Sequence, residues 1–221
     1  TVQNIEAMKI DAVVMRHPTP GSCNHLTRFV DAIVINAGDG THEHPTQAIL
    51  DIMSLSEKFG EIKGLNIGII GDISHSRVAL SNIYGLTTLG ANVTLCGPPN
   101  LMPSFIENFD ISVNTNVDEV IDWADALNVL RIQKERMGFG LIPSIREYRS
   151  MFGITKERVD QHKKEIVIMH PGPVNRGVEI DSAVADSDQA IILDQVLNGV
   201  ASRMAILYLL CSAKTDNGKQ P

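Results

Sequence analysis

The sequence is poor in cysteine and in long apolar runs, and each shortage excludes a class of protein. Its three cysteines, Cys23, Cys96 and Cys211, lie far apart and include no Cys-x-x-Cys pair. Neither a disulfide framework nor a zinc site is therefore indicated. We find no apolar run near the roughly 20 residues of a membrane span, and the start lacks the pattern of a signal peptide. We therefore expect a cytoplasmic protein with no membrane partner.

Positive charge is also in the minority. Lysine and arginine total 19 against 26 aspartate and glutamate residues, which gives a net charge of -7. Nucleic-acid binding requires clustered positive charge, so we expect no nucleic-acid partner. A few arginines that converge in one cleft would still bind a small anion. Hydrophobic residues make up 43% of the 221 residues, which is enough for a globular core.

Short apolar runs rich in β-branched residues alternate with segments of helical periodicity. Continuous apolar strands are typical of a parallel sheet covered on both faces, so the alternation predicts an α/β fold. The expected strands are 11–15, 32–36, 65–71, 92–96, 126–130, 165–169 and 190–193. The expected helices are 22–30, 45–58, 76–89, 103–108, 117–123, 142–152, 156–164 and 198–211.

A long amphipathic helix that begins near Pro45 suggests the boundary between two lobes, each with a parallel sheet flanked by helices. We expect residues 1–45 to belong to the first lobe, with the C-terminal helix 197–212 packed on it. Residues 46–196 would form the second lobe, and the polar segment 213–221 a flexible tail. Because Thr1 stands within a helical pattern, we expect the first lobe to be incomplete.

Five polar clusters each follow a predicted strand, at the edge where open parallel sheets bind ligands. The first is Met-Arg-His-Pro, in which Arg16 directly follows the apolar run. Its guanidinium could pair with a phosphate or a carboxylate. Taken alone, the same pattern fits a surface arginine at a strand end better.

The second cluster, Thr-His-Glu-His-Pro-Thr-Gln, stands at the predicted start of a helix. Pro45 suits the first helical turn, and His44 lies beside exposed amide groups that favour an anion. Gln47 shares the face of His44, so the pair could hold a carbonyl compound; the alternative is a histidine that only caps the helix. A metal pair of His42 and His44 is disfavoured, because they lie on different faces and no third ligand is near.

The third cluster is Gly-Asp-Ile-Ser-His-Ser-Arg. A dinucleotide site would need a third glycine beside Gly68 and Gly71, and an acid at the end of the next strand. Both are missing, so a nicotinamide cofactor is disfavoured. Ser74 or Ser76 can cap the following helix. Arg77 then enters its first turn, where a cation opposes the helix dipole, which marks it as a candidate anion ligand.

The last two clusters follow later strands. In extended chain, Arg131 and Gln133 point the same way and could hold one carboxylate, although a solvated loop would look similar. In His-Pro-Gly-Pro-Val-Asn-Arg-Gly, two prolines around a glycine predict a stiff loop, residues 171–173, that presents backbone carbonyls. Such a loop accepts hydrogen bonds from an amino or amide group.

Together and in this order, the five clusters resemble the catalytic chain of the aspartate carbamoyltransferase family, over residues 2–212. That family transfers a carbamoyl group from carbamoyl phosphate to L-aspartate, an early step of pyrimidine biosynthesis. The resemblance implies no metal and no organic cofactor. It also implies a homotrimer with shared active sites, in which regulatory chains are a further possibility. The first lobe would be the carbamoyl-phosphate domain and the second the aspartate domain.

The resemblance also implies a role for each site residue. Arg16, His44 and Gln47 would contact carbamoyl phosphate, with Arg16 and His44 as the catalytic pair. Arg77, Arg131 and Gln133 would hold the aspartate carboxylates. Pro171, Gly172 and Pro173 would accept the carbamoyl amino group through their carbonyls. His44 would polarise the carbamoyl oxygen as negative charge builds on it.

The sequence departs from the family at one place and leaves two alternatives open. The family's Ser-Thr-Arg-Thr-Arg phosphate motif and a lysine loop that reaches a neighbouring site do not occur in these residues. A non-catalytic homologous lobe is therefore one alternative. Ornithine carbamoyltransferase is the other, but its signature resembles His-Cys-Leu-Pro rather than His-Pro-Gly-Pro. An ornithine site would also need an acid for the side-chain ammonium, whereas Arg131 suits a carboxylate.

Overall fold

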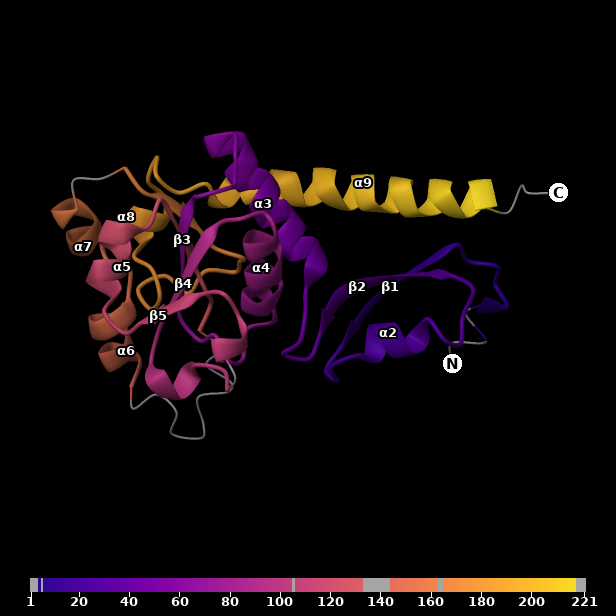
Figure 1. Cartoon of the computed structure of the whole chain (residues 1–221), viewed down its shortest axis with the longest axis horizontal. Helices are drawn as coiled ribbons and strands as arrows, with labels where there is room; N and C mark the ends of the chain where they lie inside the picture. The colour runs from indigo at the N-terminus through magenta and orange to yellow at the C-terminus, as the bar shows by residue number, and fades with distance from the viewer. Residues whose placement is uncertain (1–3, 5, 105, 133–143, 163–164, 218–221) are drawn as a thin grey trace.

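A computed structural model of the chain describes residues 4, 6–104, 106–132, 144–162 and 165–217 (Figure 1). The strands are β1 (Ala12–His17), β2 (Ile33–Asp39), β3 (Asn66–Ile70), β4 (Asn92–Cys96), β5 (Ser112–Asn114), β6 (Ala126–Val129) and β7 (Val167–Met169). The α-helices are α2 (Ser22–Leu26), α3 (Pro45–Phe59), α4 (Arg77–Thr88), α5 (Val117–Trp123), α6 (Ile145–Phe152), α7 (Lys156–Gln161), α8 (Ser182–Ala185) and α9 (Ile192–Asn217). Short 3₁₀ helices lie at Pro99–Leu101 and Ile106–Asn108.

The strands form two parallel sheets, which confirms the predicted α/β fold with two lobes. β1 pairs with β2, and these strands together with α2 (residues 12–39) are called the small lobe below. The other five strands lie in the order β5-β4-β3-β6-β7, and residues 62–191 around them are called the large lobe. α3 lies between the two lobes. α9 packs beside it and runs from the large lobe along one side of the small lobe (Figure 1).

The large lobe has a hydrophobic core on each face of its sheet, as its continuous apolar strands predict. Along β3, Ile69 packs in a core with residues of α3 and α4, whereas Ile70 packs in a second core with residues of α5 to α8. Both side chains are fully buried. Figure 1 shows the same division, with α4 on one side of the sheet and α5 on the other.

Helix α9 joins α3 through buried polar side chains. Asn198 donates to Ser54 Oγ at 3.0 Å, and Gln195 donates to Asp51 at 2.7 Å. Much of the remaining surface of α9 is apolar and exposed. By length and composition alone, its segment Ile192–Ala213 is long and apolar enough to cross a membrane, which corrects our expectation that no such stretch exists. Within this segment, the hydrogen bonds of Gln195 and Asn198 to α3 are typical of a helix that packs against another helix of the same protein.

Several segments of the structure differ from the expected elements. Residues 190–193 do not form a strand, because only Ala190 bridges β7 at Ile168 and α9 then begins at Ile192. The short edge strand β5 was not expected. α9 continues through Asn217, where we expected a loose tail, and residues 218–221 lie outside the described part of the chain. The lobe boundary at residues 45 and 46 stays a prediction.

Candidate active site

A cavity of about 200 Å³ opens where the carboxyl ends of strands from both lobes meet. Its lining includes every predicted site residue that the structure describes: Arg16, His44, Gln47, Arg77, Arg131, Pro171, Gly172 and Pro173. The remaining predicted residue, Gln133, lies outside the described residues. The chain thus brings together side chains from β1, from the starts of α3 and α4, and from the loops after β6 and β7. Their catalytic and binding roles stay predictions.

A buried carboxylate shapes the small-lobe side of the cavity. Asp39, at the end of β2, accepts hydrogen bonds from the Asn36 amide and from the backbone N–H groups of Gly21 and Glu43. Burial would raise the pKa of Asp39, but these bonds and one from His42 hold it below its usual value. The carboxylate therefore fixes the turn that leads into α3.

His42 contacts the carboxylate of Asp39 in the same turn. Its Nδ1 lies 3.2 Å from Asp39 Oδ2, and its side chain is half-exposed. Within the described part of the chain, no three His, Cys, Asp or Glu side chains gather in a way that could hold a metal ion. The structure therefore offers no second ligand partner for His44 there.

His44 occupies the N-cap position of α3, but its side chain does not cap the helix. Its backbone N–H donates to Ser81 Oγ at 2.8 Å, and the imidazole makes no cap hydrogen bond. Burial, followed by the nearby cations Arg203, Arg16 and Arg77, lowers the pKa of His44 from 6.5 to about 4. The ring is therefore neutral near pH 7.

One ring nitrogen of His44 lies near a hydroxyl that can either donate or accept. The hydroxyl of Thr46 lies 3.4 Å from Nδ1. A hydroxyl that donates to Nδ1 leaves the ring proton on Nε2, because a neutral imidazole has one donor and one acceptor. The ring can then act as a neutral hydrogen-bond donor to an oxygen that gains negative charge.

Arg77 reaches the cavity across a gap that a glycine provides. Ser76 caps α4 by accepting from the Ala79 N–H at 3.2 Å, as one of the two predicted caps, and Arg77 follows in the first turn. A Cβ atom on Gly38 of β2 would lie 2.7 Å from Nη1 of Arg77. Gly38 also has a φ of 115°, which side chains rarely adopt. The contact joins residues 39 positions apart, and no local pattern in the sequence predicts it.

Arg131 follows β6 and lines the large-lobe side of the cavity. Its neighbour Ile132 is buried, as alternation in an extended segment predicts. The buried Nε of Arg131 has no hydrogen-bond partner among the described residues. An unpaired guanidinium nitrogen at a cavity is suited to bind an incoming anion.

Asp72 and His75 also line the cavity, although the sequence did not predict them as site residues. His75 Nδ1 lies 2.8 Å from Asp72 Oδ1, which also accepts the His75 N–H at 3.2 Å. The signal that could have found them is their place in the polar cluster after β3.

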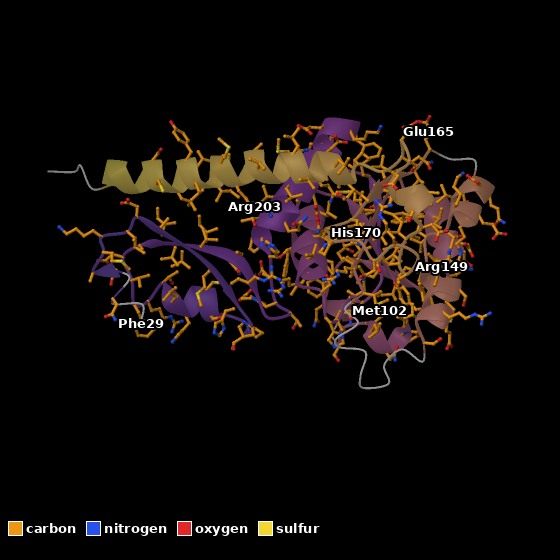
Figure 2. The ribbon with its side chains drawn as sticks, turned by 180° about the vertical axis from the view of Figure 1, so that it is seen from behind. Phe29, Met102, Arg149, Glu165, His170 and Arg203 are labelled. Carbon is orange, nitrogen blue, oxygen red and sulfur yellow. The ribbon has the colours of Figure 1, made fainter. Side chains whose placement is uncertain are left out.

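The loop at residues 171–173 is held from both ends by buried side chains. His170 Nδ1 accepts the Gly172 N–H at 2.9 Å, and Glu179 accepts the Asn175 N–H at 2.6 Å. His170 and Glu179 contact each other at 3.2 Å, and both are buried. Figure 2 places His170 among the packed side chains of the large lobe. The Gly172–Pro173 peptide is cis, and the stiffness of the loop stays a prediction.

Fold and cavity together define a two-lobed α/β protein with a cavity lined by three arginines between the lobes. The family model described as the Asp/Orn-binding domain of aspartate/ornithine carbamoyltransferase matches residues 63–210. The model of the carbamoyl-P-binding domain of the same family matches residues 1–57. The chain belongs to the aspartate/ornithine carbamoyltransferase family.

Individual relatives agree. The chain is 58% identical to the aspartate carbamoyltransferase catalytic subunit of Christiangramia forsetii, over 96% of this chain and 68% of the relative. It is 54% identical to that of Gemmatimonas aurantiaca, over 98% and 68%.

Solved structures share the fold. Trypanosoma cruzi aspartate transcarbamoylase in complex with carbamoyl phosphate superposes with a TM-score of 0.83 at 28% identity, over 94% of this chain and 69% of that one. The catalytic subunit of M. jannaschii aspartate transcarbamoylase superposes with a TM-score of 0.81 at 33% identity, over 99% and 71%. Ornithine carbamoyltransferase from Pyrococcus furiosus superposes with a TM-score of 0.83 at 24% identity, over 96% and 70%, and shares the fold alone.

Proposed function

We propose that this protein transfers the carbamoyl group of carbamoyl phosphate to the amine of L-aspartate, which gives N-carbamoyl-L-aspartate and phosphate in pyrimidine biosynthesis. The observation that carries the proposal is the convergence of three arginines and a neutral histidine in one cavity between the lobes. Such a set suits a phosphate beside a dicarboxylate. Two relatives that are 58% and 54% identical to this chain over the aligned residues are named aspartate carbamoyltransferase catalytic subunits.

In the proposed reaction, the small lobe and α3 bind carbamoyl phosphate. Arg16 pairs with its phosphate, and His44 donates to the carbamoyl oxygen from Nε2. The carbonyls of the 171–173 loop and the oxygen of the Gln47 amide accept hydrogen bonds from the carbamoyl amino group. Because His44 is neutral in the free site, it stabilises the oxyanion as a hydrogen-bond donor and not as a cation.

The large lobe then binds the second substrate. Arg77 and Arg131 hold the aspartate carboxylates, with Gln133 beside Arg131. The deprotonated amine attacks the carbamoyl carbon, the bond from that carbon to the phosphate oxygen breaks, and phosphate leaves with the electron pair. As the new C–N bond forms, the nitrogen passes one proton to the departing phosphate. Holding both substrates side by side supplies much of the rate enhancement.

Ornithine as the second substrate is the main alternative. Ornithine would be carbamoylated on its side-chain amine, so its α-ammonium would need an acid in the cavity. Among the described lining residues the carboxylate is Asp72, whose Oδ1 is already bonded to His75. The unpaired Nε of Arg131 favours a carboxylate at the same place. Both observations support aspartate.

The test supplies carbamoyl phosphate with aspartate, with ornithine, or with no amine. We expect phosphate release and carbamoyl-aspartate only in the first reaction. Citrulline in the second would instead assign ornithine as the substrate. Release of phosphate in none of them, from a folded protein, would favour a non-catalytic homologous lobe.

We also propose a cytoplasmic homotrimer with shared active sites, which regulatory chains could join. The family resemblance and the relatives' name of catalytic subunit support an assembly. Light scattering should give the mass of three chains, and a mass of one chain would contradict it. Cell fractionation should recover the protein with soluble markers, and recovery with membranes would contradict the location.

A further inference from the structure

A buried carboxylate lies directly behind the cavity and belongs to none of the residues discussed as substrate ligands. Asp51 stands one helical turn after Gln47 on α3 and is completely buried. Among the residues that the structure describes, four side-chain amides donate to it. Gln47 and Gln195 donate to Oδ1 at 3.0 and 2.7 Å, and Asn82 and Asn128 donate to Oδ2 at 2.8 and 3.3 Å.

This arrangement fixes the direction of each amide. A carboxylate offers only acceptors, so each amide turns its NH₂ group toward Asp51 and its oxygen away. For Gln47, which lines the cavity, the oxygen is the atom left for a ligand. An amide flipped the other way would place oxygen against oxygen in a buried site, which is costly.

The same carboxylate is linked to the loop on the far side of the cavity. Gln195 donates to Asp51 and, through its own oxygen, accepts the His170 N–H at 2.9 Å. The His170 ring in turn holds the Gly172 N–H. One buried group therefore connects the Gln47 amide with the backbone of the 171–173 loop.

We propose that Asp51 is a positioning residue that orients both acceptors for the carbamoyl amino group, the Gln47 oxygen directly and the loop carbonyls through Gln195 and His170. This rests on the proposed function. It goes beyond that function because Asp51 touches no substrate and instead sets the hydrogen-bond polarity of groups that do. Its action should therefore concern the carbamoyl end of the substrate and leave the phosphate end alone.

That distinction gives the test. Dissociation constants for carbamoyl phosphate and for inorganic phosphate, which lacks the carbamoyl group, are measured on wild type and Asp51→Asn. Both proteins are produced as the whole gene product. Asparagine has the shape of aspartate, but one of its two terminal groups is an NH₂ donor. The amides that face this group must therefore turn their oxygens toward it. We expect about tenfold weaker carbamoyl phosphate binding, the scale of one buried hydrogen bond, and phosphate binding unchanged within about twofold.

A double-mutant cycle separates positioning from a general loss of structure. If Asp51 acts through Gln47, then Asp51→Asn should cost much less in a Gln47→Ala background than in wild type. Ser54→Ala is the matched control, because Ser54 is buried on the same helix and bonds to α9 without lining the cavity. It should leave both dissociation constants unchanged.

Each other outcome counts against the proposal. Equal loss of phosphate and carbamoyl phosphate binding in Asp51→Asn, or full additivity with Gln47→Ala, would reduce Asp51 to a structural residue. If Asp51→Asn does not fold, Gln195→Ala replaces it with the same expectation and the same contradicting results. A wild-type protein that binds carbamoyl phosphate no better than phosphate would overturn the proposed function and this role together. If wild type and Asp51→Asn prefer carbamoyl phosphate over phosphate to the same degree, the positioning role of Asp51 would be overturned and the proposed function would stand.

Discussion

The two lobes differ in how they are held together, although both supply side chains to one cavity. The large lobe buries a core on each face of five strands, and residues such as Leu127 of β6 are wholly inaccessible. The small lobe has two strands and one helix, and Val14 of β1 and Phe29 after α2 are 63% and 59% exposed. Figure 2 shows Phe29 at the outer side of the small lobe.

The comparison teaches that the two halves of the site are fixed by different interactions. In the part of the small lobe that the structure describes, Cys23, Leu26 and Ile35 are buried, and hydrogen bonds order the turn at the end of its two strands. The Asp39 carboxylate fixes the turn there, and the Arg77 guanidinium packs against Gly38. We therefore expect stability to depend on the large lobe and substrate binding to depend on both.

The largest effect should come from the core of the large lobe. Leu127→Ala removes buried methyl groups and leaves a cavity, so we expect a loss of about 2–5 kcal/mol in unfolding free energy. Urea denaturation followed by circular dichroism measures it. An unchanged midpoint would mean that this core is not what stabilises the molecule.

Arg131→Ala should affect the large-lobe half of the site alone. Loss of one member of a charged pair costs on the order of 2–5 kcal/mol of binding free energy, so the dicarboxylate succinate should bind much more weakly. Carbamoyl phosphate should bind nearly as before, because Arg16 and His44 face it. Two titrations compare the ligands. A variant that loses carbamoyl phosphate and keeps succinate would show that the halves are assigned the wrong way round.

His44→Ala should lower kcat by ~10²–10³, the usual loss for one oxyanion donor. The fold should persist, since the imidazole makes no helix-cap hydrogen bond. Steady-state kinetics and far-UV circular dichroism check the two halves of this prediction. Near-normal turnover would remove His44 from the mechanism.

His44 should also make stability depend on pH. Its pKa is about 4 when folded and 6.5 ordinarily, so between these values the unfolded chain binds more protons. The free energy of unfolding should therefore fall as pH drops from 6.5 to 4. In the His44→Asn variant, the free energy of unfolding should fall less over the same range. Melting temperatures of both proteins across this window provide the measurement. Parallel curves would contradict the shift.

The smallest effect should come from the exposed strand of the small lobe. Val14→Ala should change the unfolding free energy by less than about 0.5 kcal/mol, because the side chain is 63% exposed. The same denaturation experiment as for Leu127→Ala gives a direct comparison. A loss of several kcal/mol would mean that Val14 is covered in the assembled protein.

Much of the fold could be predicted because local pattern decides it. The apolar runs in β3 and β6 and the His-Pro start of α3 are local signals, and the structure places them as expected. The polar edge strand β5 and the start of α9 were missed. β5 is three residues long with exposed side chains, and the four-residue apolar run at 190–193 suits either element.

The candidate site was predictable where a polar residue directly follows a strand, and unpredictable where distant residues meet. Arg131 belongs to the first kind, and so does Arg16, although β1 continues through it to His17. The partners of Asp51 belong to the second, because Asn128 and Gln195 are 77 and 144 residues away in sequence. No spacing rule reveals such contacts, so the buried amide cluster emerged only from the structure.

The placement of α9 has a consequence for how the protein is made. Of the described elements, α9 is the last to leave the ribosome, since synthesis runs from the N-terminus. Yet it carries Gln195, which bonds to Asp51, and Arg203, which helps to lower the pKa of His44 (Figure 2). A nascent chain that lacks α9 has the described residues that line the cavity. It lacks the side chains of α9 that bond to Asp51 and lower the pKa of His44. Assembly of the site is therefore a late event, completed when the final helix docks on α3.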